Sequence, residues 1–101
     1  MKILQINYKT KRTKLELEQA QMQATQPISK VKGLLWKIWI MNEAEKLAGG
    51  IYLFEDDASV EAYLKGEIVS MVKNSPATTD FEAKVFDVAT EPTKVTHGPL
   101  G

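Results

Sequence analysis

The sequence predicts an α+β fold in which two helices cover one face of an antiparallel four-stranded sheet. Three observations lead to this prediction. Apolar and polar residues alternate in short segments, as they do along strands that have one buried face. Two other segments carry apolar residues at helical spacing. The segments follow one another in the order βαββαβ, which is the split βαβ pattern and puts both helices on the same side of the sheet.

The first strand and the first helix occupy the N-terminal third of the chain. Residues 2–8 alternate and predict the strand. A helix is expected over residues 13–29, where Leu, Glu, Gln, Ala and Met predominate. Pro27 should end this helix or bend its last turn, because proline has no amide hydrogen and clashes with the preceding turn.

The remaining elements follow from the same patterns. Residues 33–41 and 49–55 predict two strands joined by a polar hairpin connection. Asp56 and Asp57 are expected to supply the N-cap of a helix that runs to about residue 73, since a carboxylate at a helix start accepts from free backbone amides. Residues 80–88 alternate again and predict the fourth strand.

Length and composition restrict the function. With 101 residues the chain should form one domain, over residues 1–90, followed by a tail over residues 91–101. Thirteen basic residues balance thirteen acidic ones, which argues against a basic nucleic-acid-binding face. The absence of cysteine excludes disulfides and thiolate chemistry. No secretory signal and no long apolar run are present, so we expect a cytoplasmic protein that does not bind a membrane.

The second strand raises the question of what covers the other side of the sheet. Residues 34–41 are apolar on both alternating faces except at Lys37. We assign the aliphatic set to the helix side, namely Leu4, Ile6, Leu34, Trp36, Ile38, Ile40, Ile51, Leu53, Ala83 and Val85. The opposite set is then Gln5, Asn7, Leu35, Lys37, Trp39, Met41, Tyr52, Phe54, Lys84 and Phe86. A large apolar patch of this kind usually marks an interface, so we expect a homodimer formed through this second face.

The same aromatic face contains the candidate site residues. Aromatic rings around a few polar groups are typical of small-molecule sites. The candidates for binding a small aromatic molecule are Trp39, Phe54, Phe86 and Gln5, and those for catalysis are Lys37, Tyr52 and Asn7. For the aromatic residues the alternative is that they are only dimer core. For Lys37 it is an ion pair with Glu82 or with a carboxylate of the partner. The only histidine, His97, lies in the tail, and we expect no metal site.

The chain resembles the YdhR-like putative mono-oxygenase family of the dimeric α/β-barrel superfamily. The resemblance is carried by LLWKIW at 34–39, AGGIYLFED at 48–56, AYL at 62–64 and AKVFDV at 83–88, together with LQI in the first strand. It implies a ferredoxin-like βαββαβ protomer whose sheet closes with that of its partner into a barrel. The pocket would lie between sheet and helices or inside the barrel. Haem-degrading barrels of similar fold bind the iron through a core histidine, which no predicted strand or helix here contains.

The resemblance also implies an activity, that of a cofactor-independent mono-oxygenase. In similar oxygenases a flat, ionisable aromatic substrate, such as a polycyclic phenol or anthrone, loses a proton and itself reduces dioxygen, without metal or flavin. The enzyme supplies orientation, proton transfer and charge stabilisation. By position Phe54 matches an aromatic pocket residue, whereas Gly50 stands where such oxygenases have a polar residue. Lys37, Tyr52 or Asn7 would then take over that role. The alternative is a dimeric barrel protein that binds a small molecule without catalysis.

Overall fold

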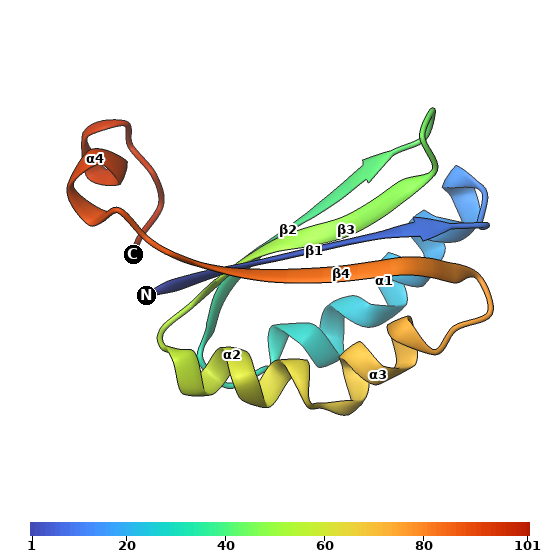
Figure 1. Ribbon diagram of the computed structural model, residues 1–101, viewed down its shortest axis with the longest axis horizontal. Helices are drawn as coiled ribbons and strands as arrows, with labels where there is room; N and C mark the ends of the chain where they lie inside the picture. Colours follow the sequence, from blue (N-terminus) through green and yellow to red (C-terminus); the bar gives the residue numbers. More distant parts are fainter.

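The computed structural model describes residues 1–101 and has the predicted ferredoxin-like architecture (Figure 1). One antiparallel sheet has the strand order β2-β3-β1-β4 and is formed by β1 (Lys2–Thr10), β2 (Leu34–Asn42), β3 (Leu47–Phe54) and β4 (Thr78–Asp87). One face of the sheet is covered by α1 (Lys14–Ser29), α2 (Asp57–Leu64) and α3 (Glu67–Lys73), and the short α4 (Thr90–Val95) lies beyond one end of the sheet. None of these helices combines the length and the apolarity needed to cross a membrane.

Helix α1 begins with a capping box. The Thr13 hydroxyl accepts from the Glu16 amide at 3.2 Å, and the Glu16 carboxylate accepts from the Thr13 amide at 2.9 Å. These two bonds satisfy backbone donors that have no partner inside the helix. Pro27 lies within the last turn, and the helix ends two residues later at Ser29.

The second predicted helix is divided into α2 and α3. Asp56 caps α2 as predicted, accepting from the Ser59 amide at 2.8 Å. Gly66 has extended backbone angles and is the N-cap of α3, so a single helix over residues 56–73 was wrong. Glycine has a low helix propensity, which explains a break at this position.

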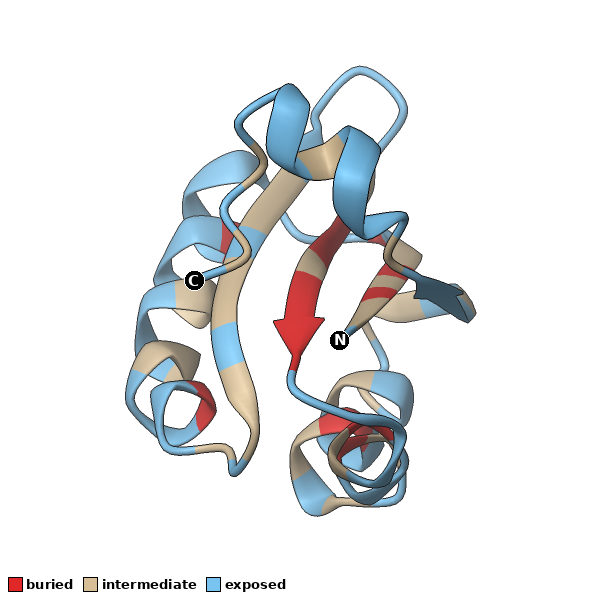
Figure 2. Ribbon diagram, turned by 90° about the vertical axis from the view of Figure 1, so that its left-hand side faces the viewer, coloured by how far each residue is buried: buried red, intermediate tan, exposed pale blue.

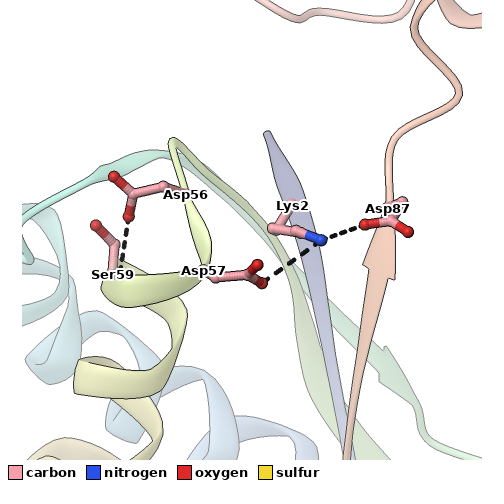
Figure 3. A network of polar contacts seen from close by, with 5 residues as sticks. All are labelled: Lys2, Asp56, Asp57, Ser59 and Asp87. Atoms are coloured by element: carbon pink, nitrogen blue, oxygen red, sulfur yellow. Dashed lines mark hydrogen bonds and ion pairs between the residues drawn. The ribbon is translucent and has the colours of Figure 1, made fainter.

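A small polar network holds the start of β1 between two other elements. The Lys2 ammonium forms ion pairs with Asp57, at 3.5 Å, and with Asp87 (Figure 3). The hydrogen bond to Lys2 lowers the pKa of the Asp87 carboxyl and raises that of the Lys2 ammonium. The two aspartates are exposed, so these pairs align the first turn of α2 with the ends of β1 and β4 and contribute little stability.

The two faces of β2 and β3 are the reverse of the prediction. Tyr52 and Phe54 point toward the helices and are almost completely buried in the core. They pack there with Leu4 and Ile6, and with three side chains of α2 and α3, Val60, Tyr63 and Val69. Figure 2 shows the buried residues concentrated in the central strands and on the sheet-facing sides of the helices. In these two strands Lys37, Trp39, Tyr52 and Phe54 therefore face the helices, and Trp36, Ile38, Ile51 and Leu53 lie on the outer face, whereas Leu34 faces the helices as predicted.

A β-bulge explains the inversion in β2. Leu34 pairs with Phe54, but Trp36 pairs with Leu53, so Leu35 is an extra residue in β2. An extra residue shifts every later side chain of its strand to the opposite face. Lys37 and Trp39 therefore share the helix-facing side with Leu34, whereas Trp36 and Ile38 lie on the outer face.

The C-terminal segment is ordered against this outer face. Residues 90–95 form α4, where a tail was predicted, and the Trp36 indole Nε1 then donates to the Pro99 carbonyl at 2.7 Å. Leu53, which pairs with Trp36, is fully buried. Ile38 and Phe86 on the same face remain 51% and 46% exposed. The segment thus covers one end of the outer face and leaves the rest open.

Candidate active site

A cavity lies between the sheet and the helices α1 and α3. Its volume is about 90 Å³, and thirteen of its seventeen lining residues are hydrophobic. The others are Arg12, Gln21, Lys37 and Gly49. Two cations but no carboxylate therefore face this cavity, so it suits an apolar ligand that carries or acquires negative charge.

Lys37 is the most unusual side chain of the cavity. Its Nζ lies 3.4 Å from the ring centre of Trp39 and 4.6 Å from that of Tyr52. An ion pair with Glu82, one of the alternatives for Lys37, is absent, because Lys37 faces the helices whereas Glu82 lies opposite Asn7 and contacts Lys84 at 2.9 Å. Burial, which disfavours the charged ammonium, lowers the pKa of Lys37 to about 7. Lys37 can therefore exist both as a neutral amine and as a cation held by aromatic faces near neutral pH.

Gly50 provides the space that Lys37 occupies. Gly50 pairs with Trp39 across the β2–β3 ladder, and a Cβ atom at Gly50 would lie 2.5 Å from the Lys37 Cε. Any larger side chain at position 50 would displace the lysine. Gly50 stands where a polar residue was expected and has no side chain of its own. The space beside it is filled by the Lys37 side chain from the neighbouring strand.

Two tyrosines form a hydrogen-bonded pair in the wall of the cavity. The Tyr63 hydroxyl donates to the Tyr52 hydroxyl at 3.1 Å, and the rings lie 5.2 Å apart between centres. Burial is the main cause that raises the pKa of both phenols. Both stay protonated at neutral pH, so they act as hydrogen-bonding groups and not as phenolate bases.

The opposite wall depends on a second β-bulge, in β4. The register between β1 and β4 shifts by one residue after Asn7, and Asp80 has a left-handed φ of 53°. Phe81 then stacks on Tyr8, with ring centres 6.4 Å apart and an interplanar angle of 12°. The two stacked rings complete an aromatic lining that faces Lys37.

The structure brings only part of the predicted site together. Lys37, Trp39 and Tyr52 line the cavity. Phe54 lies behind them in the core, stacked on Tyr52 at 6.0 Å. The other three candidates, Asn7, Gln5 and Phe86, lie on the outer face of the sheet and do not reach the cavity of their own protomer.

Sequence reasoning missed the aromatic cavity residues Tyr8, Tyr63 and Phe81 and the second cation of the cavity, Arg12. Tyr8 shares the face of Leu4 and Ile6, and Tyr63 belongs to the apolar stripe of its helix, so both could have been found from periodicity. Phe81 depends on the bulge at Asp80, and Arg12 on how the chain turns into α1. Neither the bulge nor the direction of this turn can be predicted from the sequence alone.

The fold and the cavity together define a small ferredoxin-like α+β protein with an aromatic, cation-containing pocket between sheet and helices. The chain belongs to the family described as "Putative mono-oxygenase ydhR", whose sequence pattern matches residues 3–99. This match includes α4 and the segment that contacts Trp36. No protein with a curated description matches the sequence.

Solved structures share the fold at low sequence identity. A protein of unknown function from Nitrosomonas europaea is 15% identical, with a TM-score of 0.72 over 87% of this chain and 88% of that one. A structure described as a putative antibiotic biosynthesis monooxygenase from Deinococcus radiodurans is 12% identical, with a TM-score of 0.68 over 87% and 92%. The haem degrader MhuD from Mycobacterium tuberculosis, with two haems bound in its active site, is 17% identical, with a TM-score of 0.65 over 86% and 95%. At these identities the similarity shows the fold alone.

Proposed function

We propose that this protein is a cofactor-independent mono-oxygenase that acts on a flat, ionisable aromatic molecule. The observation that carries the proposal is the Lys37 amine, which lies between two aromatic rings in a cavity without any carboxylate. Membership of the mono-oxygenase family supports the reaction class. The aromatic lining supports the substrate class.

In this proposal Lys37 performs the proton transfer. Because burial lowers its pKa to about 7, much of it is a neutral amine at neutral pH. The amine removes a proton from the phenol or the activated C–H group of the substrate and becomes an ammonium. The positive charge then stabilises the substrate anion in a site from which water is largely excluded.

The substrate anion is the reductant of dioxygen. An anthrone carbanion adds O₂ at carbon, and the resulting peroxide loses water, so that one oxygen atom stays in the product as a carbonyl. The Lys37 ammonium returns its proton to the peroxide, which regenerates the amine. The Tyr52 hydroxyl, kept protonated by burial, is suited to hydrogen-bond the substrate oxygen.

The size of the cavity requires the Lys37 side chain to move when a substrate binds. An apolar cavity of about 150 Å³ holds one benzene, and the present cavity measures about 90 Å³. A lysine stem has several rotatable bonds and no ion pair to hold it, so it can swing aside at low cost. We propose that the substrate ring occupies the space between Trp39 and Tyr52.

The homodimer is proposed on the outer face of the sheet. This face carries Ile38, Ile40 and Ile51, and no helix covers its centre. The sequence predicted aromatic residues on the face that forms the dimer, whereas the structure places aliphatic residues there. A large exposed aliphatic surface marks an interface in the same way. A second copy that contributes the same face is the simplest partner.

Oxygen uptake measured with a panel of anthrones and polycyclic hydroquinones tests the function. The expected result is consumption above the rate in buffer, with one oxygen atom incorporated into the product from ¹⁸O₂. Binding is followed separately by tryptophan fluorescence in Trp36→Phe, in which Trp39 of the cavity is the one remaining tryptophan. Binding without consumption for every member of the panel would instead support the alternative, a non-catalytic small-molecule-binding protein.

A further inference from the structure

A second cavity adjoins the aromatic one at the end of the sheet where β1 turns into α1. Its volume is about 300 Å³, and it shares Arg12 and Leu17 with the aromatic cavity. It lies between the β1–α1 connection and the β2–β3 turn. The two cavities are therefore neighbouring compartments, with Arg12 and Leu17 at their boundary.

The outer compartment is basic. Its charged lining consists of four cations, Lys11, Arg12, Lys14 and Lys46, and one carboxylate, Glu43. The whole chain carries thirteen basic and thirteen acidic residues, so this excess of positive charge is local. The four cations form no ion pair, because every ion pair of the structure involves Lys2 or Lys84. These positive charges are therefore free to interact with a ligand.

The backbone of this basic rim is well fixed. The Thr10 amide donates to the Lys46 carbonyl at 2.9 Å, which ties the β2–β3 turn to the end of β1. The Arg12 amide donates to the buried Thr10 hydroxyl at 3.2 Å. Lys46 itself has a left-handed φ of 56° within a turn closed by its amide and the Glu43 carbonyl. The cations are thus presented from a rigid edge beside the cavity mouth.

Arg12 links the rim electrostatically to the aromatic cavity. Burial raises the pKa of the Tyr8 phenol, and the charge of Arg12 opposes that rise. Tyr8 lines the aromatic cavity, so the guanidinium field reaches into it. A ligand whose ring lies inside would have an outward-pointing substituent close to this charge.

We infer that the rim formed by Lys11, Arg12, Lys14 and Lys46 binds an anionic substituent of the molecule whose ring enters the aromatic cavity, so that the preferred ligands are aromatic acids. The inference rests on the proposed function insofar as it assigns the substrate class of that same pocket. A guanidinium can bind a carboxylate through two parallel hydrogen bonds, and neighbouring ammonium groups add to the attraction. The carboxylate stays near solvent, while the ionisable position of the ring reaches Lys37.

Calorimetric titration with 2-naphthoate and its neutral isostere 2-naphthamide tests this inference. We expect the wild-type protein to bind the acid about tenfold more tightly than the amide at low salt, the order expected for a few exposed charge contacts. The preference should shrink at high salt, since exposed charges are screened. In Arg12→Gln/Lys46→Gln the ratio of the two affinities should fall to about one. Lys94→Gln, on α4, is the matched control and should keep the preference.

Three results would overturn the inference. The first is equal affinity for acid and amide, or no measurable binding of the acid. The second is a preference that survives in Arg12→Gln/Lys46→Gln. The third is a preference lost in Lys37→Met alone, which would put the carboxylate deep in the cavity. The titration measures binding and involves no oxygen turnover. Loss of the preference for the acid would therefore not contradict the oxygenase proposal, and absence of oxygen uptake would not contradict anion binding by the rim.

Discussion

Lys37 occupies a position that few lysines in proteins have, since its ammonium is partly buried and faces aromatic rings without a carboxylate. Such a charge lowers stability, because desolvation of an ammonium is not compensated by an ion pair. This cost is consistent with the proposal that Lys37 serves the chemistry of the pocket and not the stability of the fold. The consequence can be measured as a dependence of stability on pH.

We predict that Lys37→Met stabilises the protein at pH 6, by on the order of 1–2 kcal/mol, because methionine keeps the apolar stem and removes the charge. The pKa of Lys37 falls from 10.5 in the unfolded chain to about 7 in the folded one. Between these values the unfolded state binds more protons, so wild-type stability rises with pH over this window. The advantage of Lys37→Met should therefore be largest below pH 7 and smaller at pH 9.

Thermal melts of both proteins at pH 6 and pH 9 check this prediction. Lys84→Met on the outer face is the control, because Lys84 is exposed and should show no such dependence. A lower melting temperature of Lys37→Met at both pH values would contradict the account. It would show that the aromatic contacts of Lys37 stabilise the fold.

At the scale of the strand, Gly49 and Gly50 are adjacent but have different roles. A Cβ at Gly49 would overlap the backbone carbonyl oxygen of Ile6 in the neighbouring strand, which cannot move without breaking the ladder. A Cβ at Gly50 would meet the flexible end of Lys37, and then Tyr52 at 3.1 Å. The first glycine is required by the sheet, and the second by the pocket.

We therefore predict that Gly49→Ala destabilises the protein by about 2 kcal/mol or more, in the range of overpacked core substitutions. Gly50→Ala should cost clearly less but should displace Lys37. Urea unfolding gives the two stabilities, and binding of an aromatic ligand reports on the pocket. Equal loss of stability in the two variants, or normal ligand binding by Gly50→Ala, would be inconsistent with this division of roles.

The sequence predicted the elements well and the faces of two strands poorly. Alternation and helical spacing were sufficient for the βαββαβ order of elements along the chain and for the covering of one face by helices. The inversion within β2 came from the bulge at Leu35, which carries no glycine or other turn residue as a signal. Without it, parity placed Leu34 and Lys37 on opposite faces. The inversion of β3 came from grouping its aliphatic residues with Leu4, whereas the register puts Tyr52 opposite Leu4 and therefore on the same face. The prediction that Lys37, Trp39 and Tyr52 lie on one common face is nevertheless confirmed, because all three face the helices and line the cavity.

Other differences have equally local causes. The break at Gly66 divides one predicted helix, yet its apolar stripe still reaches the core through Val60, Tyr63 and Val69. The contact between Trp36 and Pro99 joins residues far apart in the chain and could not be read from composition. Asn7 was grouped with Lys37 only because the face of β2 was misassigned relative to β1.

At the scale of the whole molecule, the main unusual feature is the apolar part of the outer face that remains exposed in a single chain. Ile38 is half exposed there, on an edge of the sheet next to the segment that holds Trp36. If two copies meet through this face, a charge introduced within its exposed apolar part should prevent association. The helix-covered side offers a comparison, since Met71 is also exposed but lies on α3.

We predict that the wild-type protein sediments as a dimer at micromolar concentration and that Ile38→Lys sediments as a folded monomer. An unpaired ammonium in an apolar interface costs several kcal/mol in two symmetric copies, enough to dissociate most dimers of moderate affinity. Met71→Lys should remain dimeric. A wild-type monomer, or dissociation of both variants alike, would contradict an interface on the outer face.

In the proposed function, the Lys37 amine transfers the proton that starts the reaction with dioxygen. The most direct test is the pH dependence of kcat/KM for oxygen consumption, because this quantity reports ionisations of the free enzyme. With an anthrone that stays protonated in solution over the range measured, we predict a rise in rate through a pKa near 7. In Lys37→Met the rate should fall by about 100-fold or more, the usual contribution of a general base, and the ionisation near pH 7 should vanish. An unchanged rate in Lys37→Met, or the same pH profile in both proteins, would contradict the proposal.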